Sequence, residues 1–185
     1  MSTTPIIIVS GASGSGKTTL CRMVSNELGL YYSISYTTRP IRPQETNGFD
    51  YHFVSRDTFD KMIANGDFLE WAEVYGNFYG TSRHPIEAHN KKGVGVILDV
   101  DIQGGFSIKQ AIPEAVMVFV KAPSIEVLKS RLLKRGGLTE EAFKRRLSEA
   151  AIEEASSHTY DHVVVNEELQ IAYQELLQIV AEHLK

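Results

Sequence analysis

The sequence has little of several features that mark other classes of protein. One of its 185 residues is a cysteine, Cys21, which excludes an internal disulfide and favours a reducing compartment. Cys21 lies among the apolar residues of a predicted helix, a position typical of a packed side chain rather than a reactive thiol. With six prolines and no repeats or low-complexity tracts, the chain is predicted to be an ordinary globular domain.

Long hydrophobic runs and an excess of positive charge are also lacking. The apolar run 6–9 is short and follows no basic segment, so we expect neither a signal peptide nor a membrane span. The formal net charge of −4 argues against nonspecific binding of nucleic acid, which needs a basic surface. We expect a cytoplasmic protein without a nucleic-acid, membrane or obligatory protein partner.

The sequence does contain a glycine-rich stretch, residues 11–18, which fits the phosphate-loop pattern G-x-x-x-x-G-K-S/T. Glycines let consecutive backbone N–H groups curl around a polyphosphate, and the helix predicted over 17–28 points its positive end at the same anion. Lys17 would reach the β- and γ-phosphates, and the Thr18 hydroxyl would ligate Mg²⁺. The alternative is a Gly/Ser-rich surface turn, which the strand pattern before the loop and the helix pattern after it disfavour. We predict a nucleoside-triphosphate site.

Strand and helix patterns alternate along most of the chain. Continuous apolar runs, typical of strands buried on both faces, occur at 6–9, 94–98, 116–120 and 163–165. They predict an α/β fold, a mostly parallel sheet of the P-loop NTPase type with helices on both faces. Ligands are expected beyond the carboxyl ends of its strands.

The middle third of the chain departs from this alternation. We predict a strand over 31–38, a loop over 39–50, a short strand over 51–54 and a helix capped by Ser55. An irregular hairpin is predicted over 68–81, with its turn at Gly76-Asn77. This segment is a candidate inserted subdomain.

Three stretches could bind the molecule that accepts the phosphate. Arg39 and Arg42 follow a strand end, and guanidinium groups pair bidentately with phosphate, although loop arginines are commonly solvated. Glu70 lies among aromatic residues, where a carboxylate can accept hydrogen bonds from guanine; the alternative is an aromatic core with charges pointing outward. Asp99 and Asp101 end a buried strand, where a carboxylate can hold Mg²⁺ or cap the next helix.

Together these stretches resemble the guanylate kinase family over nearly the whole chain. The resemblance lies in motifs that follow one another in order, which makes it more specific than any single motif. The matching segments are the phosphate loop, the S-x-T-T-R-x-x-R pattern over 35–42, and 47–54, 68–72, 76–80, 99–104 and 163–166.

The resemblance implies transfer of the γ-phosphate of ATP to GMP or dGMP, in line, assisted by Mg²⁺ and without a general base. It implies one domain with a core over 1–34, 82–130 and 150–185, a GMP-binding subdomain over 35–81 and a helical lid over 131–149. The lid has independent support, because six basic and two acidic residues lie between positions 131 and 146 of an acidic protein. Gly136 and Gly137 would form its hinge.

The resemblance also implies a role for each matching residue. For ATP these are Gly11, Ala12, Ser13, Gly14, Ser15, Gly16, Lys17, Thr18, Thr19 and, near adenine, Asn166. For Mg²⁺ they are Thr18 and Asp99. For GMP they are Arg39, Arg42, Tyr51 and Tyr79 at the phosphate, Ser35, Glu70 and Thr81 at the base, and Asp99 and Asp101 between base and metal. For catalysis they are Lys17, Arg39, Arg131, Arg135 and Arg146.

Two alternatives stay open at this point. Guanylate-kinase-like domains also act as protein-binding modules in scaffold proteins, although such modules have eroded phosphate loops. A kinase for another small phosphorylated acceptor could share the ATP loop, but it would lack the combination of Ser35, Glu70 and Tyr79.

Overall fold

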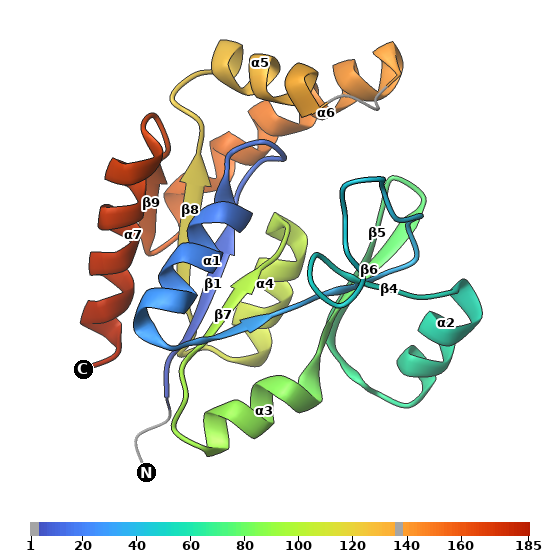
Figure 1. The fold of residues 1–185 in the computed structure, drawn as a ribbon, viewed down its shortest axis with the longest axis vertical. Coiled ribbons are helices and arrows are strands. Elements are labelled where there is room, and N and C mark those ends of the chain that lie inside the picture. The colour runs from blue at the N-terminus through green and yellow to red at the C-terminus, as the bar shows by residue number, and fades with distance from the viewer. Residues whose placement is uncertain (1–3, 136–138) are drawn as a thin grey trace.

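The computed structural model describes residues 4–135 and 139–185, with the side chain of Arg135 excepted. Its centre is a five-stranded sheet in the order β2-β7-β1-β8-β9, in which every neighbouring pair is parallel (Figure 1). The strands are β1 (Ile6–Ser10), β2 (Tyr31–Ser33), β7 (Val96–Asp99), β8 (Val116–Lys121) and β9 (His162–Val165). The predicted α/β fold with a mostly parallel sheet is confirmed.

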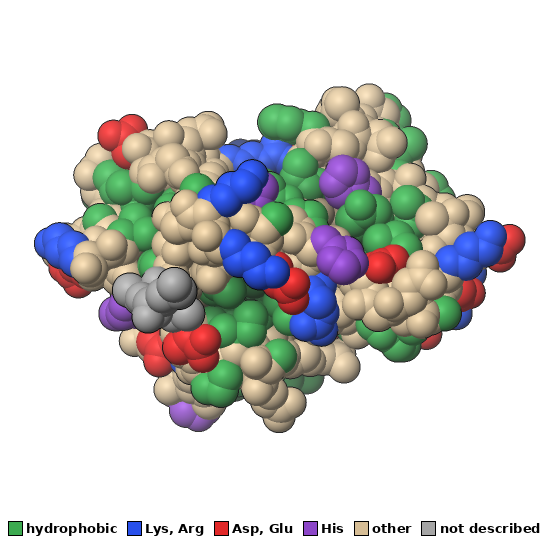
Figure 2. Space-filling view, turned by 90° about the horizontal axis from the view of Figure 1, so that it is seen from below, with side chains coloured by type: hydrophobic (Ala, Val, Ile, Leu, Met, Phe, Trp, Pro, Cys, Tyr) green, Lys and Arg blue, Asp and Glu red, His purple; other side chains and the backbone are tan. Residues whose placement is uncertain are grey.

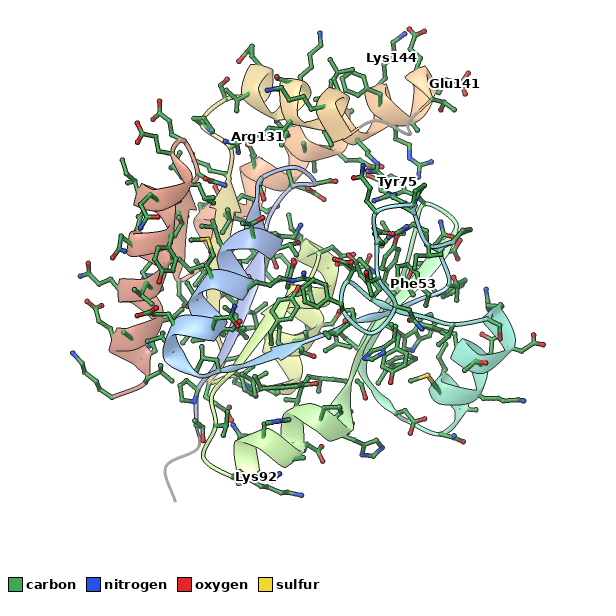
Figure 3. All side chains as sticks on the ribbon, viewed as in Figure 1. Phe53, Tyr75, Lys92, Arg131, Glu141 and Lys144 are labelled. Atoms are coloured by element: carbon green, nitrogen blue, oxygen red, sulfur yellow. The ribbon has the colours of Figure 1, made fainter. Side chains whose placement is uncertain are left out.

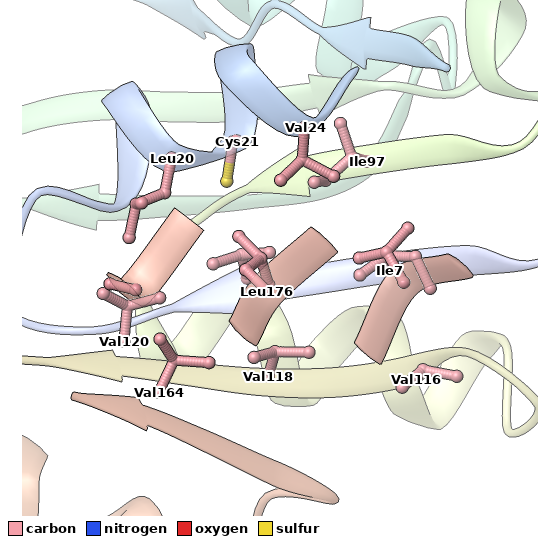
Figure 4. Close-up of a cluster of buried hydrophobic side chains, with 13 residues drawn as sticks. Ile7, Leu20, Cys21, Val24, Ile97, Val116, Val118, Val120, Val164 and Leu176 are labelled. Atoms are coloured by element: carbon pink, nitrogen blue, oxygen red, sulfur yellow. The ribbon is translucent and has the colours of Figure 1, made fainter. Parts of the chain in front are cut away.

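Helices cover both faces of this sheet because successive strand residues point to opposite sides. Ile7 and Val9 of β1 pack against α1 (Lys17–Leu28) and α7 (Leu169–His183), as Figure 4 shows for the buried cluster on that face. Ile6 and Ile8 face the other way, toward α3 (Arg83–Lys91) and α4 (Ile102–Ala111). Burial on both faces explains why the strands are continuously apolar in sequence.

A second, four-stranded sheet lies beside the first and has the order β4-β3-β6-β5. Its strands are β3 (Tyr36–Thr37), β4 (His52–Phe53), β5 (Phe68–Val74) and β6 (Asn77–Ser82), and α2 (Arg56–Ala64) packs against it. Phe59 of α2 meets Phe68 and Phe78 in a small aromatic core of its own. The middle third of the chain therefore contributes a sheet of its own, and its assignment as an inserted subdomain stays a prediction.

Two further helices, α5 (Ile125–Arg135) and α6 (Glu140–Ala155), lie between β8 and β9 in the chain. A 3₁₀ turn (Ser156–Thr159) joins α6 to β9. Leu128 and Leu132 of α5 pack against Ala150 of α6. Thr139 caps α6 by accepting a hydrogen bond from the Ala142 amide. The predicted Gly136-Gly137 break lies outside the described residues.

Local signals placed several other boundaries correctly. Gly29 ends α1 in the left-handed conformation, with φ of 66°, which glycine adopts without strain. Ser55 caps α2 by accepting a hydrogen bond from the Thr58 amide. Within the described parts of the chain, no helix is both long and apolar enough to cross a membrane.

The structure also corrects the sequence analysis. The strand predicted over 31–38 is two strands, β2 and β3, in different sheets. Aromatic and β-branched residues favour a strand in either sheet, so local pattern cannot detect a change of partner. The turn of the β5–β6 hairpin is Tyr75-Gly76 rather than Gly76-Asn77. Helix α3 was not predicted, because its sequence contains Pro85 and buries one apolar side chain, Ile86.

The surface carries charges of both signs. Figure 2 shows the face at the end of the molecule below α3 in Figure 1, where basic, acidic and histidine side chains alternate with apolar atoms. Such a mixed surface is ordinary for a globular protein.

We expect Phe59→Ala to destabilise the protein by about 3 to 5 kcal/mol. Phe59 is fully buried, and the small aromatic cluster around it has few side chains that could fill the space left by the missing ring. Urea unfolding measures this value. Ile171→Ala, at a position 61% exposed on α7, should stay within about 0.5 kcal/mol of the parent chain. Equal effects of the two substitutions would contradict the assignment of Phe59 to a core.

Candidate active site

The phosphate loop runs from the end of β1 to the start of α1. Its backbone is packed so closely that two of its glycines have no room for a side chain. A Cβ at Gly11 would lie 2.0 Å from the carbonyl oxygen of Val120, and one at Gly16 would lie 2.2 Å from Nδ2 of Asn166. Both glycines also have positive φ angles, 148° and 93°. The loop is therefore fixed by its neighbours as well as by its own sequence.

Two side chains from distant parts of the chain hold the loop. Asn166 Nδ2 donates to the Ser15 carbonyl at 2.7 Å, and Arg131 donates to the carbonyls of Ser15 and Asn166 at 3.4 and 2.9 Å. Figure 3 shows Arg131 beside the loop at the base of α5. Asn166 is buried and faces the loop backbone. Its contact with adenine stays a prediction.

A single cavity of about 880 Å³ connects the loop to the second sheet and to α6. A volume of this size suits a bound ligand. Seventeen of the predicted residues line it: Gly11, Ser13, Gly14, Gly16, Lys17, Thr18, Thr19, Ser35, Arg39, Arg42, Tyr51, Glu70, Tyr79, Asp99, Asp101, Arg131 and Arg146. Ala12, Ser15, Thr81 and Asn166 are buried next to it, and the side chain of Arg135 lies outside the described residues.

The pairing of β1 with β7 brings Asp99 to the phosphate loop, since Val9 and Asp99 are register partners. Thr18 Oγ1 donates to Asp99 Oδ2 at 2.5 Å, and Lys17 Nζ lies 3.9 Å from Asp99 Oδ1. Tyr32 adds a longer hydrogen bond to the same carboxylate, at 3.4 Å. Asp99 thus lies beside the two residues expected to meet the β- and γ-phosphates and the metal.

The Thr18 hydroxyl and the Asp99 carboxylate are oxygen ligands that fit Mg²⁺. This ion keeps several waters and takes one or two protein ligands together with substrate phosphates. In the described residues no group of three or more His, Cys, Asp or Glu side chains could hold a metal ion. The alternative role of a helix cap applies to Asp101, which accepts from the Gly104 amide at 2.7 Å at the start of α4.

The arginines predicted to bind an acceptor phosphate face an acidic residue that the sequence analysis did not single out, Glu45. Arg39 donates two hydrogen bonds to its carboxylate, at 2.8 and 2.9 Å, and the Arg42 amide donates a third at 2.9 Å. Burial acts to raise the pKa of Glu45, but these hydrogen bonds outweigh it and the pKa lies below its ordinary value. The sequence signal that could have identified Glu45 as a partner of these arginines is its position three residues after Arg42.

Glu70 lies deep in the cavity on β5, opposite Thr81 of β6. Thr81 Oγ1 donates to Glu70 Oε1 at 2.6 Å and so orients the carboxylate, and its own contact with the base stays a prediction. Burial raises the pKa of Glu70 to about 7, the Thr81 hydrogen bond opposes this, and the charge of Asp101 adds to it. Of the aromatic residues near Glu70, Phe68 and Phe78 belong to a buried cluster and Trp71 is 47% exposed, while the carboxylate reaches the cavity.

Helix α6 supplies a cation between the two ends of the cavity. Arg146 Nη1 lies 3.5 Å from Ser13 Oγ of the phosphate loop. Burial lowers the pKa of Arg146, and the nearby positive charges of Arg42 and Arg39 lower it further. Arg146 is thus close to both the loop and the arginine pair, although more than a hundred residues separate it from each in sequence.

Two contacts that the sequence analysis missed join the walls of the cavity. On α1, Arg22 donates to the Phe49 carbonyl at 2.7 Å and pairs with Asp50 at 3.2 Å. At the hairpin tip, the Tyr75 hydroxyl donates to Glu149 of α6. Neither contact has a local sequence signal, because each joins residues that only the fold brings together.

The protein-family model for guanylate kinase matches residues 2–183. The chain belongs to the guanylate kinase family. Guanylate kinase from Neisseria gonorrhoeae is 48% identical over 176 residues, 95% of this chain and 86% of the relative. That from Carboxydothermus hydrogenoformans is 44% identical over 97% of this chain and 89% of the relative. The crystal structure of guanylate kinase from Anaplasma phagocytophilum superposes with a TM-score of 0.79 at 33% identity, over all of this chain and 89% of that one.

Membership of the guanylate kinase family confirms the resemblance and makes the chain an enzyme, an ATP-dependent kinase of GMP. The family assignment therefore favours the enzyme over a scaffold module that only binds proteins.

The raised pKa of Glu70 predicts a pH dependence of stability. Between its unfolded pKa near 4.5 and about 7, the folded chain holds a proton that the unfolded chain has lost, so the free energy of unfolding falls as pH rises. Relative to Glu70→Gln, the parent chain should lose about 2 to 3 kcal/mol between pH 4.5 and 7.5. Urea unfolding at both pH values measures this loss.

Glu73→Gln, at an exposed position of the same strand, is the matched control and should leave the pH dependence unchanged. A parent chain and a Glu70→Gln variant with parallel pH profiles would show that Glu70 is not desolvated.

Proposed function

We propose that this guanylate kinase transfers the γ-phosphate of ATP to GMP and to dGMP, in line, with Mg²⁺ and without a general base. One observation carries the proposal: Lys17 of the phosphate loop lines the same cavity as Arg39 and Glu70. Two nucleotides bound at these places would meet with their phosphates facing each other. The residues 35–81 would bind the acceptor, 131–149 would act as the lid, and the rest would bind the donor.

The donor phosphates would lie against the backbone amides of residues 11–16 and the Lys17 ammonium, at the positive end of α1. Thr18 and Asp99 would hold Mg²⁺, which neutralises phosphate charge when bound. The contacts of Asn166 and Arg131 with the loop carbonyls support this role, because they hold the loop in place before the substrate arrives.

The acceptor phosphate would bind the guanidinium groups of Arg39 and Arg42, in competition with Glu45. An ionised phosphate has more charge and more acceptor oxygens than a carboxylate, so the exchange favours GMP. Tyr51 and Tyr79 would add hydrogen bonds to the same phosphate, since both line this part of the cavity.

The base would be read by Glu70 and Ser35. Guanine presents N1–H and an exocyclic amine side by side, and an ionised carboxylate accepts from both, whereas adenine offers no such pair. Glu70 would ionise as it accepts these hydrogen bonds, because bonds to the charged form lower its raised pKa. The contacts proposed here involve the base and the phosphate, which GMP and dGMP share, so the same contacts would hold dGMP.

Transfer itself needs alignment and neutralisation of charge, because the attacking phosphate oxygen is already ionised. Arg131, Arg135 and Arg146 would stabilise the charge on the phosphoryl group in flight. Closing of the lid over both nucleotides would exclude water, the competing acceptor.

A coupled assay with ATP and Mg²⁺ and a panel of GMP, dGMP, AMP, CMP and UMP tests the proposal. We expect turnover with GMP and dGMP. Turnover with a different acceptor would identify a kinase of another specificity, and no turnover with any of them would favour a protein-binding module.

Lys17→Ala should lower kcat by about 100-fold or more, because the variant lacks a charge that faces the transferred phosphoryl group. Circular dichroism should show an unchanged fold. Lys92→Ala, at the distant end of α3, is the matched control and should keep the parent rate. A Lys17→Ala enzyme with a near-normal rate would be incompatible with the proposed donor site.

Glu70→Ala should raise KM for GMP by about 10- to 100-fold, the effect of losing hydrogen bonds to a charged group. KM for ATP should change by less than about twofold, since Glu70 lies on the acceptor wall. Initial rates with each nucleotide varied in turn measure both constants. Unchanged KM for GMP would remove Glu70 from the base site.

A further inference from the structure

We propose that Tyr75 is a positioning residue for phosphoryl transfer: its side chain fastens the tip of the β5–β6 hairpin to α6 and so fixes Arg146 between the two phosphate sites. The inference rests on the proposed function, because Arg146 has this task only if phosphates bind on both sides of it. Tyr75 acts through Arg146.

The backbone at Tyr75 is unusual. Its φ angle is 55°, and no other residue except glycine has a positive φ angle in the described parts of the chain. Tyr75 and Gly76 form the two-residue turn between β5 and β6, and Gly76 also has a positive φ angle. Such turns favour asparagine or aspartate before the glycine, because a bulky side chain strains this conformation. A tyrosine here therefore needs contacts that hold it.

The Tyr75 side chain contacts α6, while its backbone carbonyl accepts from Asn77 of β6 at 3.1 Å. The Tyr75 hydroxyl donates to Glu149 Oε2, and the Arg145 guanidinium lies 4.3 Å from the centre of the Tyr75 ring. The Arg146 guanidinium lies 5.1 Å from the same ring. Glu149 also forms an ion pair with Arg145, at 3.3 Å, so the hydroxyl and both cations belong to one cluster. Figure 3 shows Tyr75 at the hairpin tip, close to α6.

Arg146 needs such support because of where it lies. One side of its guanidinium faces Ser13 of the phosphate loop, and Arg39 and Arg42 repel it from the acceptor wall. The electron-rich face of an aromatic ring attracts a cation and so counters part of this repulsion. Without the Tyr75 ring, Arg146 would be free to move away from the acceptor arginines toward solvent.

The contact of Tyr75 with Glu149 and Arg146 also joins the second sheet to α6. Tyr75 belongs to the second sheet, and Glu149 and Arg146 belong to α6, which packs against α5. Removing the contact should leave each part folded and loosen their alignment. Loss of alignment lowers kcat, whereas KM for GMP depends on Arg39, Arg42 and Glu70, which Tyr75 does not hold.

Tyr75→Asn separates this role from folding. Asparagine suits the turn, so the thermal midpoint should stay the same or rise, whereas kcat should fall about tenfold and KM for GMP should change by less than about threefold. Tyr75→Phe keeps the ring and loses the hydroxyl, so its kcat should fall by about threefold.

The matched control is Asp60→Asn. Arg56 and Asp60 form an i, i+4 ion pair on α2, and Arg56 stacks 3.7 Å from the ring centre of Phe78 on the same hairpin. This cluster repeats the chemistry of the Tyr75 contact away from the cavity. Asp60→Asn should leave kcat unchanged.

A double-mutant cycle on kcat decides whether the hydroxyl acts through Glu149. Tyr75→Phe and Glu149→Ala remove the same hydrogen bond, so kcat of the double variant should be no lower than kcat of the more impaired single variant. If the kcat losses of the two single variants multiply in the double variant, or if kcat of Tyr75→Asn stays within twofold of the parent, the proposed role of Tyr75 is wrong and the proposed function is unaffected. A parent chain without turnover on GMP would instead overturn the proposed function, and this role with it. If Tyr75→Asn fails to fold, the Tyr75→Phe cycle decides.

Discussion

Repulsion between like charges is the constraint on which this structure depends. The proposed function brings two anionic phosphates together in one cavity, and the chain gathers cations there although its net charge is −4. Each cation is held by an oxygen atom of the protein: Lys17 by Asp99, Arg39 by Glu45, and Arg131 by backbone carbonyls. Fixed partners keep the positive charges in place before any substrate binds, which is the arrangement that electrostatic catalysis requires.

The two sheets form different parts of this cavity. A parallel sheet brings the carboxyl ends of its strands to one edge, where backbone amides and Asp99 can surround a polyphosphate. The antiparallel hairpin of the second sheet instead places Glu70 and Thr81 opposite each other, so that one side chain orients the other. A carboxylate in such a dry setting is a selective acceptor, since leaving it ionised without hydrogen-bond donors is costly.

Helix α6 contributes the positive charge of Arg146 to the cavity. In the proposed function Arg146 acts only while it stays close to the phosphate loop, and the packing of α5 against α6 alone does not fix its distance from Arg39 and Arg42. Contacts across the cavity, from Arg22 to Asp50 and from Tyr75 to Glu149, make that distance a property of the whole fold. The cavity is thus bounded by elements that also contact one another.

The sequence by itself determined the fold class, the phosphate loop, the Ser55 helix cap and the family. These depend on neighbouring residues: apolar runs, glycines at fixed spacing, and a serine beside the amide that it caps. Only the tertiary structure decided that 31–38 changes sheets, that Glu45 faces Arg39 and that Tyr75 meets α6. Strand pairing and ion pairing across the cavity are chosen by which surfaces the folded chain brings together, and residues far apart in sequence leave no local pattern from which that choice could be read.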